Sequence, residues 1–424
     1  MKIFCSSQYI AWVSLFAALM QAHGAFAEKP IPDEQQRLKA VSQLISNNLK
    51  NHPQFNAINA ELSIARAVLQ GSKKAVFNPE LELEFEDSDV ETKILGINQT
   101  IDWGDQQGSR TAIAQAQLSS AVAEYDVAVQ SLMQAQLTHL ANNQTQQQLV
   151  RLSNETLGLM KEFKQIAERR YHAGDLSQVE LNLAQLAFSQ ALMAQANTQA
   201  DATEAREQLR AILGYLPTRL PVLPEQLPEP ELSGELDVFI QALPVIQKQL
   251  ADIQVARQQV NLRKSERAWN PTIGLSAGAE GQDNLLGLSL SIPLNVRNSF
   301  SAEVDAAKQQ FISHEYRAHL SYRNAQALLL TTFERYRGLL GAWNVWREQS
   351  RDSVEQQLKL IKKLWLAGDI NATDYLMQLK QAHETKASGL KLRNQLWQVA
   401  FEWMSMTATI DRWLSISVKD LGKL

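Results

Sequence analysis

The stretch NPELELEFEDSDVETKILGINQTIDWGDQQGSR, residues 78–110, decides the fold, because a related form of it occurs a second time. The second copy, residues 270–304, reads NPTIGLSAGAEGQDNLLGLSLSIPLNVRNSFSAEV. Both copies open with Asn-Pro, alternate apolar and polar residues, pass through a polar loop and alternate again. Alternation with a period of two is typical of a strand with one apolar face. Each copy is therefore predicted to be a β-hairpin, over residues 79–102 and 271–293.

The two faces of these strands differ in chemistry. The first strand carries glutamates on one face: Glu80, Glu82, Glu84 and Glu86. The opposite face of the first strand, and the matching positions of the last strand, are apolar: Leu81, Leu83, Phe85, Leu286, Leu288 and Leu290. An ionised carboxylate is costly in lipid, so the glutamates are expected to line a watery lumen and the apolar set to face lipid. The alternative is a soluble four-stranded sheet packed on helices.

Helical sequence surrounds both hairpins. Glycine (18) and proline (12) are scarce, which favours a mainly α protein with a small β part. Residues 105–172 form one helical pattern, which would be about 100 Å long at 1.5 Å per residue. That length is too great for a compact domain. Gly174 suits a left-handed helix stop, and Ser177 with Glu180 suits a capping box that opens a return helix.

The second half of the chain repeats the first. A proline-rich linker, residues 217–232, separates a first repeat (28–216) from a second (233–410). Each repeat is predicted to contain a helix, a β-hairpin, a very long helix, a tight turn and a return helix. The turns form two tips, at 173–175 and 367–369, and both read Ala-Gly-Asp. The tail, 411–424, is left without a predicted structure.

The first 27 residues are predicted to be a cleaved export signal. They contain Lys2, an apolar core and an Ala-x-Ala site that ends at Ala27. A membrane anchor is the alternative, but the apolar core is shorter than the roughly 20 residues that a spanning helix needs. The only cysteine, Cys5, lies in this segment, so no disulfide or cysteine metal site is expected in the mature chain.

Other function classes find little support. The net charge of −4 does not favour nucleic acid as a partner. His314-Glu315 with His319 resembles a zinc protease motif, but the second histidine falls one residue too late to share a helix face with the first. The chain has no glycine-rich phosphate loop ending in Gly-Lys-Ser/Thr. We therefore expect no enzyme, no cofactor and no metal site; a coiled-coil structural protein without a pore remains an alternative.

A length of about ten residues suits a tilted strand that crosses the outer membrane, but four strands cannot close a barrel. An open sheet would leave unpaired backbone groups in lipid. Two chains would supply eight strands, a barrel filled by its own side chains, whereas three would supply twelve and leave a lumen. A homotrimer in outer membrane lipid is therefore expected.

The two Asn-Pro hairpins, the segment Gln99–Gly104 and the two Gly-Asp tips are similar to those of the TolC family of outer-membrane efflux proteins. Residues 290–294, LSIPL, with Arg297 and Asn298, most resemble the heavy-metal (CzcC-like) branch. This resemblance implies a trimeric twelve-strand barrel in the outer membrane of a Gram-negative bacterium, continued by a periplasmic tunnel of helical hairpins. It also implies two partners, a periplasmic adaptor and an inner-membrane efflux pump.

The same resemblance implies an exit duct, for divalent metal cations or, alternatively, for drugs and other small molecules. It assigns adaptor docking to the two tips, whose candidate residues are Arg170, Gly174, Asp175, Lys363, Gly368 and Asp369. Helix termination alone is the competing explanation for these residues. Asp374 matches the first of two acidic positions that gate the tunnel, but the second position holds Met377.

Overall fold

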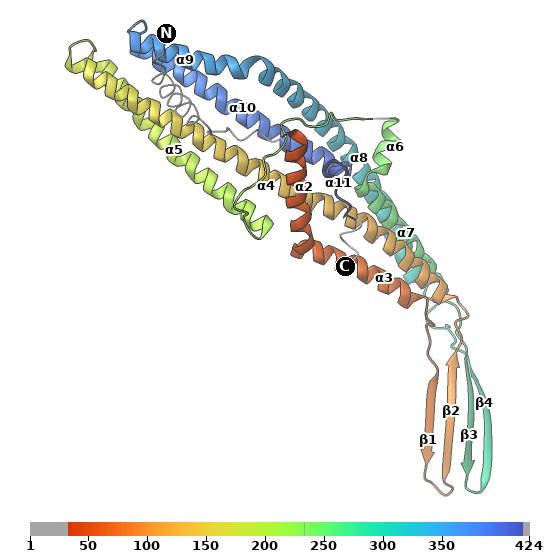
Figure 1. Ribbon diagram of the computed structural model, residues 1–424. Coiled ribbons are helices and arrows are strands. Elements are labelled where there is room, and N and C mark those ends of the chain that lie inside the picture. Colours follow the sequence, from red (N-terminus) through yellow and green to blue (C-terminus); the bar gives the residue numbers. More distant parts are fainter. Residues whose placement is uncertain (1–32, 233, 419–424) are drawn as a thin grey trace, which may run out of the picture.

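Two β-hairpins project together from one end of a long helical body, and the helical tips lie at the other end (Figure 1). The computed structural model describes residues 33–232 and 234–418. The predicted signal, 1–27, and residues 419–424 of the tail lie outside the described residues.

The hairpins form one four-stranded antiparallel sheet in the order β1-β2-β3-β4. The strands are β1 (Glu80–Glu86), β2 (Thr92–Thr100), β3 (Thr272–Glu280) and β4 (Asp283–Ser291). The β2–β3 pairing joins the two halves of the chain, with Leu95 opposite Ala277. Because this register continues into Leu83 on one side and Leu286 on the other, the apolar residues of all four strands share one face.

Helices make up most of the remaining chain. They are α2 (Glu34–Asn51), α3 (Pro53–Ser72), α4 (Gln106–His172), α5 (Gln178–Leu213), α6 (Leu236–Ala242), α7 (Pro244–Ser265), α8 (Ser301–Val345), the π-helical segment η2 (Trp346–Ser350), α9 (Arg351–Ala367), α10 (Ala372–Met406) and α11 (Ile410–Leu414). The predicted fold class, mainly α with four strands, is confirmed. Within the described ranges, no helix has the length and apolar character needed to cross a membrane.

The junction between β2 and α4 explains the residues that follow the second strand. The Asp102 carboxylate accepts the backbone N–H groups of Gln106 and Gln107, both at 2.8 Å, and so caps α4. A side chain at Gly104 would overlap the backbone carbonyl of Ser265, at the end of α7. The glycine therefore lets the junction between β2 and α4 lie close to the end of α7.

The larger core lies in the middle of the body, where the proline-rich segment packs on α8 and α10. The Trp397 indole N–H donates to the Pro224 carbonyl at 3.1 Å, and the Tyr336 hydroxyl donates to the Pro228 carbonyl. Leu223 of this segment is fully buried. No helix or strand occurs among the described residues of 217–232, yet the segment is fixed by these contacts.

The second long helix departs from the predicted continuity. The helical path from α8 to α9 passes through the π-helical segment η2. The Trp346 ring stacks on Trp343, with centroids 5.3 Å apart, and packs where a side chain at Gly389 of α10 would stand. A π turn re-aims side chains within a helix, which accommodates the two indoles here. In the first half α4 runs through all 67 residues without such a break.

Candidate functional site

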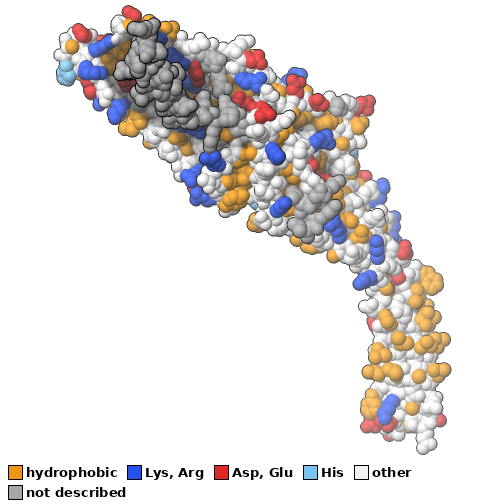
Figure 2. Space-filling model, in the orientation of Figure 1, with side chains coloured by type: hydrophobic (Ala, Val, Ile, Leu, Met, Phe, Trp, Pro, Cys, Tyr) orange, Lys and Arg blue, Asp and Glu red, His pale blue; other side chains and the backbone are white. Residues whose placement is uncertain are grey.

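One face of the sheet is apolar and exposed along its whole length. Leu286 is 88% exposed and Leu83 is 75% exposed. The large apolar residues of this face are Leu81, Leu83, Phe85, Leu95, Ile97, Ile273, Leu275, Leu286, Leu288 and Leu290. Figure 2 shows hydrophobic side chains gathered over the sheet, while charged side chains lie mainly on the helical body and at the hairpin ends. A contiguous apolar surface of this kind marks an interaction with lipid or protein.

The opposite face is polar and built from glutamates and small residues. Glu80, Glu82, Glu84 and Glu86 are all exposed, and the Asn98 amide donates to the Glu82 carboxylate at 2.8 Å. On the neighbouring strands the same rows continue into small residues: Gly96, Gly274, Ser276, Gly287 and Ser289. Toward the hairpin loops the rows also hold Ile94 and Leu285, and then the acidic Glu280 and Asp283. The face is therefore acidic along β1 and at the loop end of β3 and β4.

No lysine or arginine of the four strands lies on this glutamate face. The only basic residue of the strands, Lys93, pairs with Phe85 on the apolar face and lies 5.6 Å from the centre of its ring. Its ammonium also forms a 2.6 Å ion pair with Glu91. Lys93 therefore does not neutralise the glutamates.

The sheet is open at both sides. Within the protomer, β1 pairs only with β2 and β4 pairs only with β3. The outer edges thus present unpaired backbone N–H and C=O groups, which must find partners if the sheet lies in lipid.

The two helical hairpins turn by the same backbone motif. Gly174 and Gly368 both have positive φ, 82° and 83°. The N–H of Asp175 donates to the Arg170 carbonyl and that of Asp369 to the Leu364 carbonyl, each at 2.9 Å. This is the Schellman arrangement that a left-handed glycine permits, as the sequence predicts for Gly174. Asp175, Lys363 and Asp369 are exposed at the tips.

Residues 44–215 match the sequence family described as "Outer membrane efflux protein". This match falls within the first of the two predicted repeats. A comparison with curated protein sequences gives no match. The predicted resemblance to the TolC family and the predicted outer-membrane location are confirmed. The family consists of channels, and its members are not enzymes.

Solved structures share the fold over most of their length. A CusC structure that concerns transmembrane channel formation has a TM-score of 0.73 at 14% identity and covers 87% of this chain and 91% of its own. The CmeC outer membrane channel of Campylobacter jejuni has a TM-score of 0.69 at 15% identity, with coverage of 91% and 89%. The MtrE outer membrane channel of Neisseria gonorrhoeae has a TM-score of 0.72 at 15% identity, with coverage of 87% and 88%.

One candidate tip residue has an intramolecular partner that the sequence did not indicate. The Arg170 guanidinium lies over the Trp365 ring, 4.4 Å from its centroid, and donates to the Trp365 carbonyl at 3.2 Å. Trp365 itself is buried against Phe163 and stacks on Tyr375. Burial raises the pKa of Tyr375 to about 12, with a smaller contribution from Glu162. Arg170 therefore links the two hairpins.

The return helices begin with matching caps. The predicted capping box of Ser177 and Glu180 is confirmed, and the hydrogen bonds from Ser177 lower the pKa of Glu180. At the start of α10 the Asn371 side chain accepts from the Asp374 backbone N–H, and its amide donates to the Asp374 carboxylate, both at 2.8 Å. Asp374, the predicted gate candidate, thus occupies the position that corresponds to Glu180, and Asn371 is the N-cap of α10. Met377 is exposed.

No group of three or more His, Cys, Asp or Glu residues within 33–232 and 234–418 is placed to hold a metal ion. A buried histidine does occur farther along α10. His383 lies in a groove of about 390 Å³ between α4, α5 and α10, where its Nδ1 is 3.1 Å from the Thr156 hydroxyl. Burial, with a smaller contribution from Lys386, lowers the pKa of His383 to about 4.

His383 should make the helical body sensitive to acid. Its pKa falls from 6.5 to about 4 on folding, so the unfolded chain binds the proton more readily. Stability should therefore fall as the pH drops from 6.5 toward 4, by on the order of 3 kcal/mol. We expect His383→Asn to reduce the difference between thermal midpoints at pH 7 and pH 4.5, measured by circular dichroism.

The matched control is His172→Asn, which changes an exposed histidine of α4. This control should keep the pH dependence of the unchanged protein. An undiminished acid shift in His383→Asn would contradict the assignment.

Proposed function

We propose that this efflux protein is a passive exit duct, the outer-membrane channel of a tripartite efflux system. An inner-membrane pump supplies the energy and a periplasmic adaptor connects the two. The sheet is the observation that carries this proposal. It lies at one end of a long helical body and has an exposed apolar face, a polar face and two unpaired edges. The solved structures described above as membrane channels support it through their shared fold.

The open edges favour a homotrimer. Backbone groups in lipid need hydrogen-bond partners, and an edge of β1 can obtain them from β4 of a second copy. Three copies supply twelve strands, which is enough for a barrel with a lumen, whereas an eight-strand barrel is filled by its side chains.

The trimer and its membrane face can be tested together. We expect the protein extracted in detergent from the outer membrane to have the mass of three chains. Leu288→Arg should abolish insertion, because a charge on the lipid face costs about 2–4 kcal/mol in each copy. The adjacent Ser289→Arg projects from the other face and is the matched control. A stable monomeric barrel, or equal insertion of the two variants, would contradict the proposal.

The lumen is expected to favour cations. In a trimer the glutamates of β1 would recur three times around the lumen, and carboxylate rings are a common means of cation selection. This face of the described strands has no lysine or arginine, so the negative charge of the glutamates is not neutralised there. The acidic lumen and the CzcC-like residues 290–294 support divalent metal cations as substrates.

This selectivity has a direct electrical test. Purified trimers in a planar bilayer should give a reversal potential that favours potassium over chloride. Changing Glu80, Glu82, Glu84 and Glu86 together to glutamine should move that potential toward neutrality. Glu204→Gln with Glu207→Gln, on α5, is the control and should leave it unchanged. An unselective or anion-selective wild-type channel would overturn the role of the glutamates.

The tips are the proposed docking surface for the adaptor. Gly174 and Gly368 have open space around them, so a large side chain there would protrude into solvent. We expect Gly174→Trp with Gly368→Trp to abolish efflux in cells while trimers still reach the membrane. Each substitution also strains a left-handed residue by about 1–2 kcal/mol.

Gly214, which follows the end of α5, provides a control for that backbone strain. Gly214 also has positive φ, 74°, with open space around it, but it lies away from the tips. Gly214→Trp should retain efflux. Unchanged efflux in the double tip variant would show that the tips do not dock a partner.

A further inference from the structure

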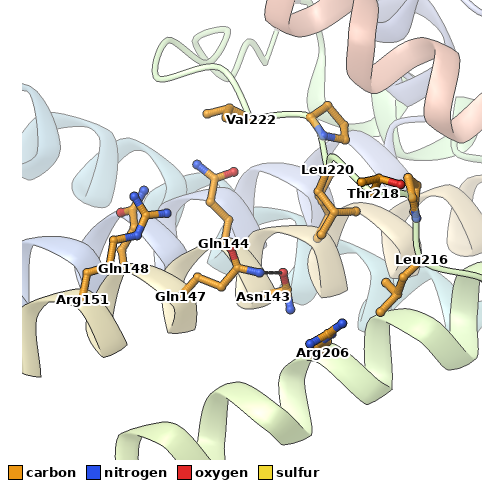
Figure 3. Close-up of a pocket in the computed structure, with 13 residues that line it drawn as sticks. Asn143, Gln144, Gln147, Gln148, Arg151, Arg206, Leu216, Thr218, Leu220 and Val222 are labelled. Atoms are coloured by element: carbon orange, nitrogen blue, oxygen red, sulfur yellow. Dashed lines mark hydrogen bonds between the residues drawn. The ribbon is translucent and has the colours of Figure 1, made fainter. Parts of the chain in front are cut away.

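A cavity of about 400 Å³ lies beside the middle of α4, away from both the sheet and the tips. Figure 3 shows its walls: polar side chains from α4, Arg206 from α5, and the segment of residues 216–222 that follows α5. This volume lies within the roughly 300–1,000 Å³ typical of small-molecule sites. The efflux path proposed above does not use this cavity.

The charged side chains that line the cavity are both basic. Arg151 and Arg206 line the cavity and are both exposed, and neither forms an ion pair with a described residue. Among the described residues that line the cavity there is no aspartate or glutamate. Glu207 lines an adjoining hollow with both arginines, but its carboxylate pairs with Arg210 at 2.8 Å. The two guanidinium groups therefore attract an anion, and a guanidinium binds a carboxylate through paired hydrogen bonds.

A buried amide adds a directed donor. Asn143 is only 1% exposed, and its Oδ1 accepts from Gln147 at 2.9 Å. Its Nδ2 has no hydrogen-bond partner in the described structure. In Figure 3 this nitrogen points away from Gln147, toward the side of the cavity where Arg206 lies. An unsatisfied buried donor costs about 1–3 kcal/mol, which an accepting ligand would recover.

The remaining wall is apolar. Its side chains are Leu140, Leu216, Pro217, Leu220, Pro221 and Val222. Such a wall offers nothing to a hydrated inorganic ion but stabilises a hydrocarbon or aromatic body.

We propose that this cavity binds a small organic anion, a carboxylate attached to an apolar body. Its carboxylate accepts from Arg206 and the Asn143 amide, Arg151 adds positive charge farther along α4, and its apolar part packs against the segment 216–222. The site is separate from the barrel and the tips, so it can be tested whether or not the channel proposal holds.

The test uses the purified full-length protein in lipid nanodiscs and 4-fluorobenzoate as the probe, followed by fluorine NMR. We expect saturable binding of 4-fluorobenzoate, and no saturable binding of 4-fluorobenzyl alcohol, which lacks the charge. Arg151→Gln with Arg206→Gln should weaken binding at least tenfold. Arg206→Gln alone should weaken binding of the probe by a smaller factor. Because it changes one exposed residue, it gives a result even if the double variant misfolds.

The control is Arg317→Gln with Arg323→Gln, two exposed arginines of α8 outside the cavity, and it should bind as the unchanged protein does. Absent binding, or equal binding by the acid and the alcohol, would overturn the proposal. A third outcome would also overturn the proposal: no binding of the probe, with dissociation of the trimer when Arg151 and Arg206 are changed. The arginines would then pair with a carboxylate of a second copy.

Discussion

The structure depends on one constraint, the need to satisfy the backbone and the apolar face of a four-stranded sheet. Water satisfies the open edges of β1 and β4 but not the leucines, whereas lipid satisfies the leucines but not the edges. Lipid together with further strands satisfies both, as in the proposed barrel. The glutamates of β1 then need an aqueous interior, so the chemistry of the two faces and the open edges lead to the same assembly.

The helical body is organised by two separate cores. The larger one holds the middle of the body and includes the proline-rich segment, which Trp397 and Tyr336 fix by hydrogen bonds to proline carbonyls. The smaller one joins α4, α5, α9 and α10 near the tips. The two halves of the chain share a plan but not every detail, since two stacked tryptophans interrupt the second long helix with a π turn.

Local signals explain what could be predicted from the sequence. Period-two alternation located the strands, and a left-handed glycine and a capping box, both short-range devices, located the first tip. The missed features depend on contacts between distant residues. The π segment needs Gly389 beside Trp346, and the partner of Arg170 is Trp365 of another helix. The hydrogen bonds between Asp374 and Asn371, by contrast, join residues three positions apart at the start of α10.

The linkage between the tips bears on how any partner would meet them. Phe163 of the first hairpin contacts both Trp365 and Tyr375 of the second, and Arg170 covers the outer side of the Trp365 ring. Aromatic pairs add about 0.5–1.5 kcal/mol each beyond the area that they bury. Separating the hairpins would expose these rings and break the hydrogen bond from Arg170 to the Trp365 carbonyl. The ends of the two helical hairpins of one protomer therefore pack as a single unit, joined by this aromatic cluster.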